Sequence, residues 1–264
     1  MNIRNAIPDD KANVLKFCKD TFSWGDYVAD VWDIWQSKGR LYVAEDDNKV
    51  VGVYNITMSE KQAWIEGMRV HPQYRRKGIG KRMLSHAESI IQNKIIRLII
   101  ENKNQPSIAL ARSMGYYLEE NWQLYSALPQ KHQSNVKITN DVSQIDDFVN
   151  SVTYADSWKW LPLDNNELQK LIYQERVIIS INNSVSSAMG IWNISNDFPK
   201  ILQIGYLNGT KEGMVQILRY VQNKAYDLNC EKVQIFVHEV TLLEVDFLEK
   251  RSIFYLMRKD KIIS

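Results

Sequence analysis

Apolar residues recur at helical spacing directly after a basic, glycine-containing stretch of the chain. Between Gly78 and Gln92 they fall on one helix face: Ile79, Met83, Leu84, Ala87, Ile90 and Ile91. This spacing predicts a helix over Gly78–Gln92. Just before it, Trp64–Val70 has the pattern of a strand. His71-Pro72 should end that strand, because proline cannot donate to a strand ladder.

The rest of the first half alternates between strand-like and helix-like segments. Ile95–Ile100 is almost continuously apolar, as in a strand buried on both faces. Further strands are expected at Ile3–Ile7, Leu41–Glu45, Val50–Met58, Gln62–Val70, Tyr116–Glu119 and Trp122–Ala127. Helices are expected at Pro8–Cys18, around Val28–Trp35, and at Ser107–Met114 with Gly115 as its stop.

The second half repeats this order after a polar linker at Lys131–Asn135. Strands are expected at Val136–Ile138, Val177–Ile181, Ala188–Ile194, Ile201–Leu207 and Lys232–His238, with helices near Val142–Val149 and at Gly213–Asp227. The pattern predicts an α/β (α+β) protein of two domains, 1–130 and 131–264. In each, we expect a mixed, mostly antiparallel twisted sheet flanked by helices.

Composition narrows the class of protein. The 264 residues suit two domains, and a hydrophobic content of 45% with eight tryptophans allows well-filled cores. No apolar run is long enough to cross a membrane, and the first ten residues lack the apolar region of a signal peptide. The two cysteines, Cys18 and Cys230, form no metal-binding pattern, so no metal is expected. We therefore expect a cytoplasmic protein, and a net charge of +2 is too small to indicate nucleic-acid binding.

The basic stretch has the features of an anion site. Arg75, Arg76, Lys77, Lys81 and Arg82 surround two glycines at the start of the predicted helix. Glycines let backbone N–H groups approach a ligand closely, and a helix N-terminus carries partial positive charge. Together they favour a pyrophosphate. The alternative is a basic helix end that faces solvent, which does not require two glycines.

The spacing of the glycines discriminates among known phosphate loops. A Walker A loop needs a glycine where Arg75 stands, and the dinucleotide fingerprint needs one where Met83 stands. Arg75-x-x-Gly78-x-Gly80, after a strand and opening a helix, instead resembles the coenzyme A signature of GNAT (GCN5-related) N-acetyltransferases. The resemblance covers about Asn2–Leu128, and a tandem GNAT architecture with a degenerate second half is expected.

This resemblance implies an acetyl-CoA site and no metal cofactor. The pyrophosphate would lie on Arg75, Arg76, Lys77, Gly78, Ile79, Gly80 and Lys81. The pantetheine arm would pair with the backbone of Met68, Arg69 and Val70 like an added strand. Asn104, followed eleven residues later by Gly115-Tyr116, matches the short helix that covers coenzyme A in the family.

The same resemblance suggests the catalytic groups. The N–H near Met68 is the expected oxyanion donor, and Glu66, two residues earlier, is the candidate base. The alternative for Glu66 is an edge glutamate that pairs with Arg69 or Lys61. The family's usual thiolate-protonating tyrosine is missing, because Ala111 stands at its position. Tyr116 or Tyr117 substitutes, the thiolate leaves unassisted, or turnover is slow.

The sequence indicates the acceptor site less clearly than the coenzyme A site. Trp24, Asp26 and Tyr27 lie in a predicted loop, where they line a ligand or simply pack. IEGMRVHP and the WGDYV…VWDIW segment resemble the histidine N-acetyltransferase group, which suggests an amino acid or small amine such as a polyamine. In the second half, Tyr206–Gly213 stands in place of the basic loop, but Glu212 would repel a pyrophosphate. We expect that half not to bind coenzyme A.

The function expected from the sequence is thus acetyl-CoA-dependent N-acetyl transfer to a small-molecule amine. A non-catalytic coenzyme A-binding or sensing protein is the alternative, motivated by Ala111 and the degenerate half. Neither a nucleic acid nor a membrane is an expected partner, and the sequence gives no oligomeric state.

Overall fold

The computed structural model describes residues 1–19, 21, 26–182, 185–241 and 243–261. The chain divides into two compact units: Met1–Glu119 together with Met257–Ser264, and Glu120–Leu256. The sequence-based border at residues 130 and 131 falls within the second of these units.

The first unit is built on a mixed sheet. Its strands run in the order β1 (Asn2–Asn5), β2 (Leu41–Asp46), β3 (Lys49–Met58), β4 (Ala63–Val70) and β5 (Ile95–Glu101). Neighbours are antiparallel except β4 and β5, which are parallel. The chain needs a crossover to make that parallel pair, and the segment with the basic loop supplies it.

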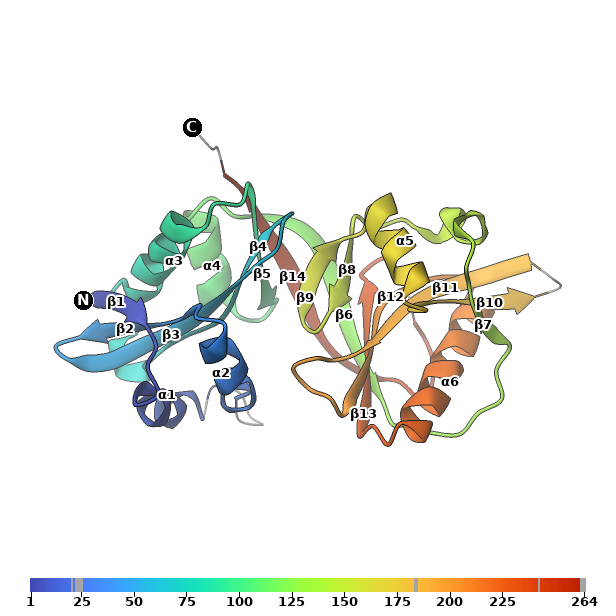
Figure 1. Ribbon diagram of the computed structural model, residues 1–264, viewed down its shortest axis with the longest axis horizontal. Coiled ribbons are helices and arrows are strands. Elements are labelled where there is room, and N and C mark those ends of the chain that lie inside the picture. The colour runs from blue at the N-terminus through green and yellow to red at the C-terminus, as the bar shows by residue number, and fades with distance from the viewer. Residues whose placement is uncertain (20, 22–25, 183–184, 242, 262–264) are drawn as a thin grey trace. The chain divides into compact units, whose positions relative to one another are not determined.

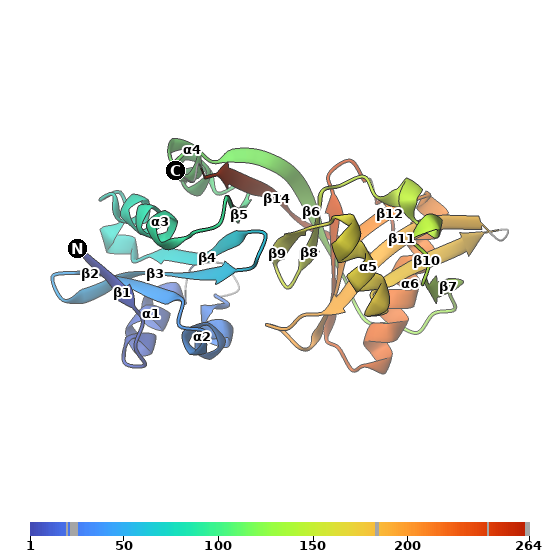
Figure 2. The same cartoon turned by 45° about the horizontal axis from the view of Figure 1, so that its top comes forward.

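Helices cover both faces of this sheet. As Figures 1 and 2 show, α1 (Asp10–Cys18) and α2 (Val28–Ser37) lie on one face, and α3 (Ile79–Ile90) and α4 (Gln105–Ser113) on the other. Helix α3 buries the apolar positions that its periodicity predicted, including Met83 and Leu84. Helix α2 buries Trp32 and Trp35, so both tryptophans belong to the core.

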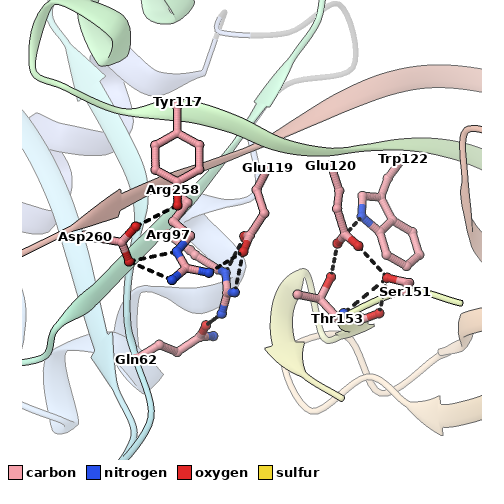
Figure 3. Close-up of polar contacts among 10 residues, drawn as sticks. All are labelled: Gln62, Arg97, Tyr117, Glu119, Glu120, Trp122, Ser151, Thr153, Arg258 and Asp260. Atoms are coloured by element: carbon pink, nitrogen blue, oxygen red, sulfur yellow. Dashed lines mark hydrogen bonds and ion pairs between the residues drawn. The ribbon is translucent and has the colours of Figure 1, made fainter. Parts of the chain in front are cut away.

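A buried polar network ties the end of the chain into the first unit (Figure 3). Glu119 accepts from Arg97 Nε at 2.6 Å and from Arg258 at 2.8 Å, and Arg97 also donates to Gln62. The Glu119 and Arg97 side chains are 8% and 3% exposed. Arg258 lies near the end of β14 (Glu249–Asp260), which follows β5 in the strand order.

The second unit contains the remaining strands of this order. Its strand order is β6 (Tyr117–Ala127), β13 (Lys232–His238), β12 (Ile201–Gly209), β11 (Val185–Ile194), β10 (Val177–Asn182) and β7 (Val136–Ile138). Only β12 and β13 are parallel among these pairs. Helix α6 (Lys211–Asp227) packs on β10, β11 and β12 through residues such as Ile217 and Val221. Helix α5 (Asn165–Tyr173) and the hairpin β8–β9 (Thr153–Asp156, Lys159–Pro162) complete the unit.

Most predicted elements are present, and the mixed α/β class is confirmed. Two local predictions are wrong: Tyr116–Glu119 and Trp122–Ala127 are parts of the single strand β6, and the segment near Val142–Val149 forms two short 3-10 turns rather than a helix. The intervening Glu120 and Asn121 fit within β6 because polar side chains are tolerated in an extended strand. Among the described residues, no helix is both long and apolar enough to cross a membrane.

Candidate active site

Strand β4 separates from β5 partway along its length. The paired register covers Ala63↔Ile96 and Trp64↔Arg97, whereas β4 continues to Val70. On its other side β4 stays paired with β3, with a register shift between Val53↔Arg69 and Asn55↔Glu66. The described part of β4 beyond Trp64 therefore presents a strand edge toward β5, to which an extended ligand can pair.

Gly67 lies within the register shift and has a φ of +64°. A Cβ at this position would come 2.5 Å from two ring carbons of Trp35, which is 2% exposed. Left-handed backbone and close ring contact both require glycine here. The bulge fixes the direction of the neighbouring Glu66 and Met68.

The Glu66 carboxylate is held in place by two neighbours on β3. Its Oε1 accepts from Asn55 Nδ2 at 3.0 Å and from Thr57 Oγ1 at 2.8 Å. Glu66 itself is half-buried, so it is oriented yet accessible. Sequence reasoning missed Asn55 and Thr57. Their alternate spacing on the strand that forms a hairpin with Glu66's own strand was the signal that could have found them.

Asp26 binds a residue of the protein itself. Its carboxylate accepts from Arg69 Nε at 2.7 Å and from the N–H of Val28 at 3.1 Å, and its side chain is 2% exposed. The Arg69 guanidinium lies 5.3 Å from the centre of the Tyr27 ring. Burial raises the pKa of the Tyr27 hydroxyl. Trp24, the third predicted acceptor residue, lies outside the described residues.

The basic loop joins β4 to α3. It begins with a 3-10 turn, Pro72–Tyr74, in which His71 Nδ1 accepts from the N–H of Gln73 at 3.3 Å. Arg75 Nε donates to the carbonyl of Val70 at 3.1 Å, which anchors the loop to the strand end. His71 is thus a turn residue, as its place before proline suggested.

The start of α3 has the geometry of an anion site. Arg76 and Gly78 have φ values of +64° and +76°, and the first helical bond runs from Arg82 N to Gly78 O at 3.1 Å. The N–H groups of Ile79, Gly80 and Lys81 therefore have no acceptor within the helix. A Cβ at Gly80 would lie 3.2 Å from Leu110 of α4.

Charge reinforces that geometry. Arg75, Arg76, Lys77 and Lys81 are all exposed around the helix start. Within the described chain, none of these four side chains is in an ion pair with an acidic group. Cations without an acidic partner, N–H groups without a helical acceptor and the helix dipole at one place suit a phosphate. The residues present thus fit the pyrophosphate of coenzyme A.

Helix α4 lies beside the first turn of α3, where Leu110 is close to Gly80. Asn104 is its N-cap, and its side chain accepts from the N–H of Ser107 at 3.2 Å. Ala111 is 2% exposed and offers no hydroxyl.

The two candidate tyrosines are held elsewhere in the first unit. Tyr117 donates to Asp260 at 2.7 Å (Figure 3). Tyr116 is 3% exposed, with the ammonium of Lys259 5.7 Å from its ring centre. Burial, together with the nearby Glu88 carboxylate, raises the pKa of Tyr116.

In the described part of the second unit, no corresponding loop joins strand to helix. Strand β12 ends at Gly209 and α6 begins at Lys211, so Thr210 alone joins them. Thr210 Oγ1 accepts from the N–H of Gly213 at 3.1 Å, and a Cβ at Gly213 would come 2.7 Å from the hydroxyls of Ser180 and Ser187. The glycines here serve close packing and do not open a backbone cradle.

The hairpin β8–β9 covers the bulge of β12. The register shifts between Ile191↔Tyr206 and Trp192↔Ile204, which makes Gly205 the bulged residue. A Cβ there would come 1.7 Å from the carbonyl oxygen of Ala155 in β8. Glu120 anchors the start of β8 by accepting from Thr153 and, at 2.6 Å, from Ser151 (Figure 3).

Comparisons with known proteins agree with this geometry. Residues 12–116 match the profile of the Acetyltransferase (GNAT) family. No curated protein matches the sequence, and the resemblance to the histidine N-acetyltransferase group is not supported by these comparisons. Among the described residues, no three acidic, histidine or cysteine side chains are grouped to hold a metal.

Solved structures resemble the chain over nearly its whole length. A putative acetyltransferase from Thermoplasma acidophilum is 15% identical with a TM-score of 0.69, covering 99% of this chain and 100% of that one. A GCN5-related N-acetyltransferase from Sphaerobacter thermophilus is 14% identical with a TM-score of 0.65, covering 98% and 95%. A tandem GNAT protein from the clavulanic acid biosynthesis pathway is 11% identical with a TM-score of 0.59, covering 100% and 99%. Residues 12–116 are thus similar to a GNAT acetyltransferase domain, and the chain as a whole has the fold of tandem GNAT proteins.

Proposed function

We propose that the protein is an acetyl-CoA-dependent N-acetyltransferase that acts on the amine of a small molecule. The observation that carries this proposal is the Glu66 carboxylate, held by Asn55 and Thr57 next to the Gly67 bulge. It adjoins the free edge of β4, which leads into the basic loop. Acetyl-CoA enters as a substrate, with its pyrophosphate on Arg76–Lys81 and its pantetheine arm along Met68–Val70.

In the proposed reaction the amine nitrogen attacks the thioester carbon. Glu66 takes the proton that the nitrogen loses, directly or through a water molecule. The N–H near Met68 donates to the oxygen on which negative charge develops. The C–N bond forms, the C–S bond breaks, and coenzyme A leaves as a thiolate, with Ala111 providing no acid to protonate it.

The test is thiol release from acetyl-CoA over a panel of amino acids and polyamines. The substitution Glu66→Gln removes the proposed base. It should lower kcat by roughly 10²–10⁴-fold, the usual contribution of general base catalysis. Coenzyme A affinity should stay unchanged, because Glu66 lies outside the loop. Glu60→Gln, in the exposed β3–β4 turn, is the matched control and should behave as wild type.

Ala111 favours a second candidate, a non-catalytic coenzyme A-binding protein. That function predicts tight coenzyme A binding with no thiol release on any amine, and no effect of Glu66→Gln. Full turnover by Glu66→Gln would refute Glu66 as the base. A cytoplasmic location stays a prediction from the sequence.

A further inference from the structure

A hollow of about 390 Å³ opens in the first unit on the side of Thr57. It is lined by Lys38, Arg40, Ile56, Thr57 and Met58. None of these residues belongs to the basic loop or to the coenzyme A edge of β4. The volume is in the range of small-molecule sites.

The hollow is connected to the proposed base by one hydrogen bond. The Thr57 hydroxyl, whose residue lines the hollow, donates to Glu66 Oε1 at 2.8 Å. Asn55, two residues earlier, pairs across the ladder with Glu66 and also donates to it. A ligand in the hollow therefore lies next to Thr57, which contacts the Glu66 carboxylate.

The charge of the hollow is positive. Lys38 is exposed and Arg40 half-buried, and no acidic residue is part of the lining. Across the described chain, neither cation forms an ion pair or a side-chain hydrogen bond. Lys38 follows the last turn of α2, where a cation also suits the helix dipole. The helix dipole does not explain the position of Arg40. Arg40 is therefore the stronger evidence for an anionic ligand.

Asp26, one of the predicted acceptor residues, is already engaged. Asp26 is bound by Arg69 and is 2% exposed. Recognition of a second cationic group through Asp26 would require breaking that buried pair, which is costly.

We infer that the acceptor is an amine that also carries a carboxylate, as an amino acid does. This inference rests on the proposed function. Arg40, assisted by Lys38, binds the carboxylate in the hollow. The amine then lies toward Thr57 and Glu66. A guanidinium pairs with a carboxylate through two parallel hydrogen bonds, which orients the acceptor as well as holding it. Polyamines, which lack an anion, are disfavoured.

The experiment compares amino acids with the amines formed by their decarboxylation, using the full-length protein and acetyl-CoA. The pairs are histidine with histamine, lysine with cadaverine, and phenylalanine with phenethylamine. We expect a higher kcat/KM for the carboxylate member of the preferred pair. Arg40→Gln should raise KM for that member about tenfold or more, the loss expected for a charge-assisted hydrogen bond. It should leave the KM of the decarboxylated amine unchanged.

Two controls separate this inference from the proposed function. Lys49→Gln removes an exposed cation at the far end of β3 and should change neither KM. Binding of coenzyme A should be the same in all variants. Preference for the decarboxylated amines, or an equal effect of Arg40→Gln on both members of a pair, overturns the inference alone. Intact coenzyme A binding without acetylation of any amine overturns the proposed function and the inference together.

Discussion

At the scale of single residues, Gly67 is constrained both by its backbone and by its neighbour. Its φ is +64°, and a Cβ would come 2.5 Å from the buried Trp35 ring. Gly67→Ala should therefore lower the free energy of unfolding by about 3 kcal/mol or more, since left-handed strain and overpacking add. Denaturant unfolding measures this loss.

Gly39 provides the matched control for that substitution. Its φ of +67° is nearly the same, yet nothing lies within 4 Å of where its Cβ would be. Gly39→Ala should cost only about 1 kcal/mol, the strain alone. Equal losses in the two variants would mean that the Trp35 contact contributes nothing.

The partners of individual side chains were the least predictable part of the site. The sequence indicated Glu66 and the glycines of the loop, because their signals are local. Asp26 also stood out in the sequence, but its partner Arg69 is 43 residues away and comes from another element. No spacing rule connects a loop carboxylate to a distant strand, so its engagement appears only in the folded chain.

At the scale of elements, the two units differ most in how a strand reaches the following helix. In the first unit, eight residues that include a 3-10 turn separate Val70 from Ile79; in the second, Thr210 alone separates Gly209 from Lys211. A helix start without a surrounding loop has fewer free N–H groups to offer, because Thr210 already caps Gly213. We predict that only the first unit binds coenzyme A.

Charge reversal at matched positions tests this difference. Lys81 and Lys211 are both exposed lysines in the first turn of the helix that follows the central strand. Lys81→Glu should weaken coenzyme A binding at least about tenfold by isothermal titration, since it places a negative charge beside the pyrophosphate. Lys211→Glu should bind as wild type. Equal weakening by both variants would contradict the assignment of the site to one unit.

Elements with a strong hydrophobic periodicity were predicted well. Elements that depend on long-range packing were not. The helix expected over Gly78–Gln92 is α3, Ile79–Ile90. The hairpin β8–β9 was missed because its two turn residues, Ser157 and Trp158, have positive φ values without being glycine or asparagine. Bonds from outside the turn hold it: the N–H of Ser157 donates to Gln203 at 2.9 Å. Such support is invisible in a local pattern.

At the scale of the whole molecule, the order of the chain and the division into units do not coincide. The last described residues, 257–261, belong to the first unit together with Met1–Glu119. A prediction that divides the sequence at a polar linker cannot detect that residues 257–261 return to the first unit. The return depends on Arg258, which donates to Glu119, and on Lys259, which pairs with Glu88 at 2.7 Å.

The pKa of Glu119 links this arrangement to pH. Burial alone would raise the pKa, but hydrogen bonds from Arg97 and Arg258 outweigh it and hold the pKa below its ordinary value of 4.5. A carboxyl whose pKa is lowered on folding contributes stability above its unfolded pKa and loses it as the pH falls through the folded pKa. The network is therefore intact at neutral pH and weakens in acid below about pH 4.5.

Truncation after Leu256 tests whether the first unit needs the end of the chain. The deletion removes Arg258 and Lys259 and leaves the half-buried Glu88 without its cation, so we expect the first unit to lose more than about 3 kcal/mol at pH 7. Thermal unfolding and limited proteolysis should show early opening of Met1–Glu119. Truncation after Lys261 keeps every named contact and should melt as the full chain does.

Because protonated Glu119 no longer needs its arginines, the stability gap between the two truncations should narrow below pH 4.5. If the two truncations melted alike at pH 7, the first unit would be complete without its C-terminal residues.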